Sequence, residues 1–147
     1  ENYASGTSIH PVVVAEEGHV FVDPSYPVAL DFMYNMVKRI RKYFGSFVFI
    51  TQNIKDLNSN PSVLSKTSAI INNCQYSMIF PLMPADMLDL VELYRASGEI
   101  NETEQNEIVN NGRGKAFFIT APRERTSINV VASEYVEGLF LDTKSAV

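Results

Sequence analysis

Hydrophobic residues occur along the chain in two patterns, short continuous runs and longer stretches with helical spacing. Val12 to Val14 and Phe47 to Ile50 are apolar runs too short for helices, and they predict strands buried as in a parallel sheet. Between them, apolar residues recur every three or four positions from Val28 to Phe44, which predicts a helix that Gly45 ends. Strand, helix and strand in this order predict a parallel pair. The predicted buried face of this helix consists of Phe32, Met33, Met36, Val37, Ile40 and Phe44.

The same alternation continues to the end of the chain. Further helices are predicted at Pro61–Asn73, at Pro84–Ser97 and from Asn101 to near Gly112. Further strands are predicted at Tyr76–Phe80, Ala116–Thr120 and Ser127–Ala132, the last two joined by a polar turn at Pro122–Thr126, and a short helix or turn at Glu134–Phe140. Asn60 is a predicted helix cap, Gly98 a stop, and Asn101 with Glu104 a capping box.

These elements predict one α/β domain over residues 1–147, with an open and mainly parallel sheet. Ligands of such sheets sit beyond the carboxyl ends of the strands. With 46% hydrophobic residues the chain can bury a sizeable core, and Met33, Met36, Met78, Met83 and Met87 are expected in it.

Charge and cysteine content narrow the possible functions. A net charge of −5 argues against a general nucleic-acid coat, because neutralising phosphates requires a basic surface. Cys74 is the single cysteine, so an internal disulfide is excluded, and we expect it to be a small buried residue. His10 and His19 lack partners at ligand spacing, so no metal site made of protein side chains alone is predicted.

The apolar runs are far shorter than the ~20 residues of a membrane-spanning helix, and no signal segment is visible. We therefore expect a soluble, intracellular chain without a transmembrane segment. Because it opens with Glu1 rather than methionine, we also expect an excised or processed fragment.

Candidate chemistry gathers at the ends of the first two predicted strands. Glu16 and Glu17 directly follow the first strand, and Gln52 follows the second. One carboxylate of such a pair can hold the water shell of Mg²⁺ while the next orients or deprotonates an attacking water. Gln52 could orient that water or sense a terminal phosphate. Solvated loop residues give the same pattern, so both interpretations stay open.

Two basic runs need separate interpretations. Lys38 to Lys42 fits a solvated helix end, an arginine that reaches a neighbouring subunit's nucleotide, or a contact to the DNA backbone. The run Gly112 to Lys115 does not fit a phosphate loop, since its lysine leads into a strand rather than a helix. We predict a tight turn there.

Several motifs in order resemble one family over about residues 11–140. They are Val12–His19, Asp31–Met33, Lys38–Lys42, Thr51–Ile54, Ile71–Asn73 and Ser133–Phe140. In this order they resemble the C-terminal ATPase domain of the large cytoplasmic ATPases of conjugative type IV secretion. Those proteins belong to the RecA-like P-loop motors, with FtsK and the HerA helicases.

The resemblance implies roles for individual residues. Glu16 and Glu17 match the Walker B acids, so Glu16 would hold Mg²⁺ through water and Glu17 would activate the attacking water. Thr51 and Gln52 match the sensor strand, where Thr51 would contribute to nucleotide binding. Arg41 matches an arginine finger acting across a subunit interface. His19 matches a residue that often follows the acid pair, with a structural role expected first.

Two departures from the family pattern shape the predicted function. The first Walker B acid is usually Asp, and Glu16 is one methylene longer. Walker A is absent, so phosphates have no cradle here. The resemblance thus implies the Walker B part of an ATP- and Mg²⁺-dependent motor, hexameric in the complete protein, acting with other secretion components at the inner face of the cytoplasmic membrane. The chain alone is predicted to be inactive and to self-associate. Alternatives are a non-catalytic RecA-like docking or oligomerisation module and a DNA translocase fragment.

Overall fold

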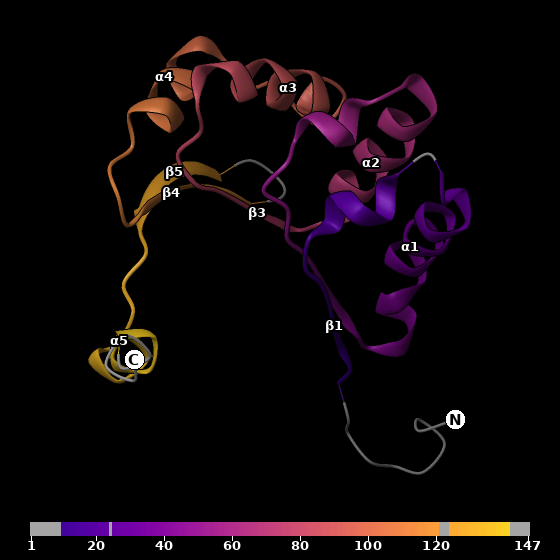
Figure 1. Cartoon of the computed structure of the whole chain (residues 1–147), viewed down its shortest axis with the longest axis horizontal. Helices are drawn as coiled ribbons and strands as arrows, with labels where there is room; N and C mark the ends of the chain where they lie inside the picture. The colour runs from indigo at the N-terminus through magenta and orange to yellow at the C-terminus, as the bar shows by residue number, and fades with distance from the viewer. Residues whose placement is uncertain (1–9, 24, 121–123, 142–147) are drawn as a thin grey trace.

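A computed structural model describes residues 10–23, 25–120 and 124–141, and in it the elements form an open arch (Figure 1). The α-helices are α1 (Pro27–Arg39), α2 (Pro61–Asn73), α3 (Pro84–Tyr94), α4 (Glu102–Asn110) and α5 (Glu134–Leu141). The strands are β1 (Val12–Ala15), β2 (Ser46–Phe49), β3 (Tyr76–Ile79), β4 (Lys115–Thr120) and β5 (Glu124–Asn129). Short 3₁₀ helices are η2 (Gly18–Val22), η3 (Ile40–Tyr43) and η4 (Lys55–Asn58).

The strands form two separate sheets. β1 and β2 are parallel, with Val12 opposite Ser46 and Ala15 opposite Phe49, as the strand–helix–strand order predicts. β3, β4 and β5 form an antiparallel sheet in that order. The α/β class is therefore confirmed, but the prediction of a mainly parallel sheet is wrong for the described residues. The chain between β3 and β4 brings β4 back alongside β3 in the opposite direction.

The helices pack mostly on one side of the strands. Figure 1 shows α3 and α4 above the sheet of β3 to β5, with α1 and α2 at the other end of the arch. The buried side chains contributed by these helices and the strands beneath form one continuous cluster. It includes Leu30, Met33, Val37, Val63, Ile70, Ile79, Met87, Leu90, Leu93, Ile100, Ile108 and Phe117.

The predicted caps of α2 and α4 are confirmed. The Asn60 Oδ1 atom accepts hydrogen bonds from the backbone N–H groups of Ser62 and Val63 at 3.1 and 3.0 Å. At α4, the Asn101 side chain accepts from the Glu104 N–H, and the Glu104 carboxylate accepts from the Asn101 N–H. Each cap satisfies backbone donors that a helix start leaves unpaired. These two helix starts were therefore predictable from sequence.

The helix after β1 is shorter than predicted. α1 ends at Arg39 and continues as η3, and Phe44 then adopts a left-handed conformation with φ of 54°. The Gly45 N–H donates to the Ile40 carbonyl oxygen at 3.1 Å, which closes the turn. Phe44 therefore adopts the left-handed conformation that ends the helical segment, and Gly45 follows it. Phe32 and Phe44, predicted on the buried face, are exposed.

Other predictions of burial and boundaries also need correction. Val12 and Val14 are 60% and 56% exposed, so β1 is not buried on both faces. Met78 and Met83 are exposed, whereas Met33 and Met87 lie in the core. Cys74 is only partly buried, and burial raises the pKa of its thiol. β5 begins at Glu124 rather than Ser127, because Glu124 already pairs with Thr120.

The remaining turn and helix predictions agree with the structure or fall partly outside it. The tight turn before β4 is confirmed by a hydrogen bond from the Lys115 N–H to the Gly112 carbonyl oxygen, with Gly114 at φ of 80°. Residues 121–123 of the predicted polar turn lie outside the described part of the chain. Within the residues that are described, no helix is both long and apolar enough to cross a membrane.

Candidate nucleotide-facing site

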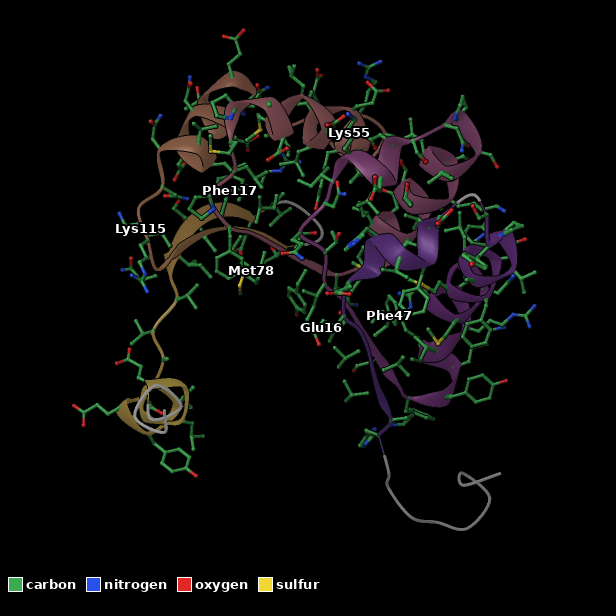
Figure 2. All side chains as sticks on the ribbon, viewed as in Figure 1. Glu16, Phe47, Lys55, Met78, Lys115 and Phe117 are labelled. Carbon is green, nitrogen blue, oxygen red and sulfur yellow. The ribbon has the colours of Figure 1, made fainter. Side chains whose placement is uncertain are left out.

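The acid pair forms a turn that is hydrogen-bonded to the end of β2. Ala15 ends β1, and its carbonyl oxygen accepts from the Ile50 N–H at 2.9 Å. The Gly18 N–H then donates back to the Ile50 carbonyl oxygen at 2.7 Å. Glu16 and Glu17 lie between these two bonds, so the acidic turn is fixed against the carboxyl end of the neighbouring strand. Figure 2 shows Glu16 where β1 meets the centre of the arch.

The backbone of this turn has a special conformation. Glu17 adopts a left-handed φ of 51°, which is uncommon for a residue with a side chain and is frequent at functional sites. The next residue must be glycine, because a Cβ atom at Gly18 would overlap the aromatic ring of Phe49. The Phe49 ring can therefore lie against the strained turn only because Gly18 has no side chain.

The segment after β2 carries Thr51 and Gln52 to the same edge. The Thr51 hydroxyl accepts from the Asn53 N–H at 3.2 Å, and Asn53 Nδ2 donates to Asp56 Oδ2 at 2.6 Å. These bonds hold the loop while the Gln52 side chain stays exposed. The structure thus brings the four predicted residues Glu16, Glu17, Thr51 and Gln52 to one edge of the parallel pair.

The two acids are available to a ligand. Both carboxylates are exposed, and neither forms an ion pair among the described residues. Exposed, unpaired carboxylate oxygens are the ligand type that Mg²⁺ accepts, directly or through water. The same part of the chain contains no group of three or more His, Cys, Asp or Glu side chains that could hold a metal ion without further ligands.

Arg41 lies at the opposite end of the parallel pair. It belongs to η3, which precedes β2, whereas Gln52 follows β2. Four residues of strand separate these ends, about 13 Å of backbone. Within the described chain, no ion pair is formed by Arg39, Arg41 or Lys42. The Lys38 ammonium group donates to the Tyr34 hydroxyl and lies over the face of the Tyr34 ring. The structure therefore does not bring Arg41 to the acid pair of its own chain.

A hollow beside the acidic turn contains His19 together with residues that the sequence patterns did not single out. It has a volume of about 350 Å³ and is lined by His19, Val20, Val22, Asp23, Asp56 and Ser59. The Nδ1 atom of His19 is buried and has no hydrogen-bond partner among the residues that the structure describes. The Ser25 N–H donates to Asp23 at 2.7 Å and lowers the pKa of that carboxyl. The one signal in the sequence that could have placed Asp56 at this site is its position four residues after Gln52.

Arg125 has a structural role on the other sheet. Its guanidinium donates to the carbonyl oxygens of Gly98 and Glu99 at 2.6 and 3.0 Å and to the Glu104 carboxylate at 2.9 Å. It thereby ties β5 to the loop that precedes α4. Because Glu104 also belongs to the capping box, the start of α4 and β5 share one polar network.

Comparison with known proteins gives a likeness among solved structures. No family model matches the chain, and no curated protein matches it in sequence. Among solved structures, VirB4 of Thermoanaerobacter pseudethanolicus matches 91% of this chain with a TM-score of 0.75 and 30% sequence identity. The chain covers 35% of the VirB4 chain. The likeness agrees with the family that the motifs resemble, so this chain is related to a part of the type IV secretion ATPases.

Proposed function

We propose that this chain supplies one side of the ATP site of a type IV secretion motor. The observation that carries the proposal is the acidic turn of Glu16 and Glu17, hydrogen-bonded to the end of β2 beside Thr51 and Gln52. The VirB4 likeness supports it, because that protein is a secretion component of the family the motifs resemble. Glu17 is the proposed general base, and Gln52 the proposed group that orients water.

The proposed cofactors are ATP and Mg²⁺. The exposed carboxylate of Glu16 is suited to the water shell of the metal, and the Thr51–Gln52 segment is suited to the phosphate side. When bound, Mg²⁺ neutralises phosphate charge and orients the nucleotide. The phosphates themselves need a cradle from another segment, because Gly112–Lys115 forms a tight turn before β4 in the other sheet.

Uncovered apolar surface supports the idea of such a further segment. Val12 and Val14 on β1, Val48 on β2 and Ile50 directly after β2 are exposed beside the acid pair. Monomeric proteins seldom expose contiguous apolar surface of this kind. In the complete motor we propose a ring, a hexamer by the family resemblance, in which Arg41 acts on the nucleotide of a neighbour. Its place would be the cytoplasmic face of the membrane, with other secretion components.

The ATPase rates of the 147-residue chain and of the full-length gene product test this function. The 147-residue chain alone should show no turnover. The full-length product of its gene should hydrolyse ATP, and Glu17→Gln should abolish most of that activity, since an amide cannot accept the proton. Glu102→Gln, at an exposed position of α4, is the matched control and should leave the rate unchanged. Turnover by the isolated chain that Glu17→Gln abolishes would contradict the claim that another segment is needed.

The same uncovered surface favours a second candidate, a non-catalytic RecA-like docking module. ATP hydrolysis and partner binding distinguish this candidate from the first. The full-length protein would hydrolyse no ATP, either as the wild type or as Glu17→Gln, and both forms would bind their partners equally well. The third candidate, a DNA translocase fragment, rests on the exposed cations of η3 and the end of α1. Salt-dependent DNA binding that Arg39→Ala with Lys42→Ala removes would favour it.

A further inference from the structure

The proposed water-orienting residue, Gln52, has an exposed side chain just after β2. Within the described part of the chain, no residue hydrogen-bonds to that side chain. An amide that orients water has to be held closely in place, because a misplacement of about 1 Å can cost about 100-fold in rate. The backbone on either side of Gln52 therefore has to fix its position.

Thr51 and Asn53, the two neighbours of Gln52, hydrogen-bond to each other across it. The Asn53 N–H donates to Thr51 Oγ1 at 3.2 Å, and the Thr51 hydroxyl donates to the Asn53 carbonyl oxygen at 3.3 Å. Both neighbours are half-buried. A hydroxyl that accepts from the backbone two residues further on closes a tight bend. Gln52 lies at the tip of this bend, so its backbone moves only with that of Asn53.

The Asn53 side chain connects the bend to η4. Asn53 Nδ2 donates to Asp56 Oδ2 at 2.6 Å, and Asp56 is half-buried. A hydrogen bond to a carboxylate is roughly twice as strong as one between neutral groups, and partial burial strengthens it further. The bond therefore fixes the bend that contains Gln52 relative to η4.

The core in turn holds η4 in place. Leu57 is 2% exposed, and its carbonyl oxygen accepts from the hydroxyl of Thr67 on α2 at 2.9 Å. Asn58 Nδ2 donates to the carbonyl oxygen of Asp89 on α3 at 2.7 Å. Asp56 thus belongs to an element that is bonded to two helices, and the Asn53–Asp56 bond joins the exposed bend to it.

We propose that Asn53 and Asp56 are positioning residues, which hold Gln52 at the acidic turn for ATP hydrolysis. The inference rests on the proposed function, in which Gln52 orients the attacking water. The acidic turn is fixed to β2 by the hydrogen bond from the Gly18 N–H to the Ile50 carbonyl oxygen. The Asn53–Asp56 bond fixes the other side of the same edge. Both residues act through Gln52 and do not themselves contact the nucleotide.

Steady-state ATPase kinetics of the full-length gene product test the role of Asn53. Asn53→Ala should lower kcat by about tenfold or more and leave KM for ATP within about twofold, because other groups hold the nucleotide. Lys55→Ala, at an exposed position between the two partners, is the matched control and should change neither constant. In a Gln52→Ala background, Asn53→Ala should cause no further loss, since no amide remains to be positioned. A general structural role would lower the rate in both backgrounds.

Exchange of the two partners gives a second test that does not remove a side chain. Asn53→Asp alone places two carboxylates together, and Asp56→Asn alone leaves a weaker neutral pair, so each should lower kcat. The double variant again pairs an amide with a carboxylate and should recover kcat to within about threefold of the wild type. Thermal unfolding of each variant shows whether it is folded.

The outcomes separate this inference from the proposed function. Suppose that Glu17→Gln and Gln52→Ala both lower kcat. The inference alone is then overturned if Asn53→Ala keeps the wild-type kcat, if it slows the Gln52→Ala protein by the same factor as the wild type, or if the double exchange fails to recover the rate. Full activity in Glu17→Gln or in Gln52→Ala, or no turnover by the wild type, would contradict the proposed function and this inference with it.

Discussion

The two faces of the sheets differ sharply in how they are covered. On the covered face, Ile79 and Phe117 pair across β3 and β4 beneath α3 and α4, and Phe117 is almost wholly buried. On the uncovered face, Met78 on β3 and Val14 on β1 remain exposed. Figure 2 shows Phe117 on the side of the sheet that faces the helices and Met78 on the opposite side. Among the described residues the fold is therefore held from one side, and the surface next to the acidic turn is exposed.

The largest expected effect separates the two faces directly. Phe117→Ala should destabilise the chain by about 3–5 kcal/mol, because it removes a buried aromatic ring and leaves a cavity. Val14→Ala on the uncovered face should cost less than about 1 kcal/mol, since much of that side chain is already in water. Urea denaturation of both variants measures the difference. Equal losses would mean that both faces are packed alike.

A second substitution tests the fit between the acidic turn and β2. Gly18→Ala should destabilise by about 1–3 kcal/mol, because its Cβ must displace the Phe49 ring. Gly112→Ala is the matched control, since a Cβ there meets nothing within 4 Å. Thermal unfolding of both variants gives the comparison. A Gly18→Ala variant as stable as Gly112→Ala would show that the turn lies further from Phe49 than described.

A smaller effect is expected at the cap of α4, on the covered side. Asn101→Ala should cost about 1 kcal/mol, because the Glu104 N–H loses its side-chain acceptor. Asn106→Ala, exposed in the same helix, should cost only a few tenths. Chemical denaturation resolves the two. If both variants lose equally little, the capping box contributes nothing to the covered side.

The smallest effect is a pH dependence from groups on the covered side. Burial raises the pKa of the Cys74 thiol above 9.0 and that of the Tyr94 hydroxyl above 10.0. The unfolded chain releases these protons first as pH rises, so the free energy of unfolding is unaffected below about pH 8 and falls above about pH 9. Cys74→Ala with Tyr94→Phe should flatten this fall, measured by urea denaturation between pH 7 and pH 10. Tyr135→Phe, at an exposed position, should leave it as in the wild type. An unchanged slope in the double variant would contradict the assignment.

Much of the fold was predictable because local signals decide it. Asn60 and the Asn101–Glu104 pair mark helix starts through their own side chains, and Gly112 to Lys115 marks a turn. The positions of Glu16, Glu17 and Gln52 at one edge follow from parallel strands ending together. These features depend on a few neighbouring residues, so the sequence is sufficient for them.

The errors arise where tertiary context decides. Phe32 and Val14 have the hydrophobic spacing of buried residues, yet the described chain leaves them exposed because no element packs over them. The direction of β4 depends on how the chain returns past α3 and α4, which periodicity does not encode. The hollow at His19 and Asp56 joins η2 to η4, and only the folded chain brings these together.

The proposed role of Glu17 is to act on a nucleotide held mainly by another segment against the uncovered face. Its most direct test is the steady-state ATPase rate of the full-length gene product, measured for the wild type, Glu17→Gln and the control Glu102→Gln. We expect a loss of at least about 100-fold in Glu17→Gln and an unchanged rate in the control. A Glu17→Gln protein that hydrolyses ATP as fast as the wild type would contradict it.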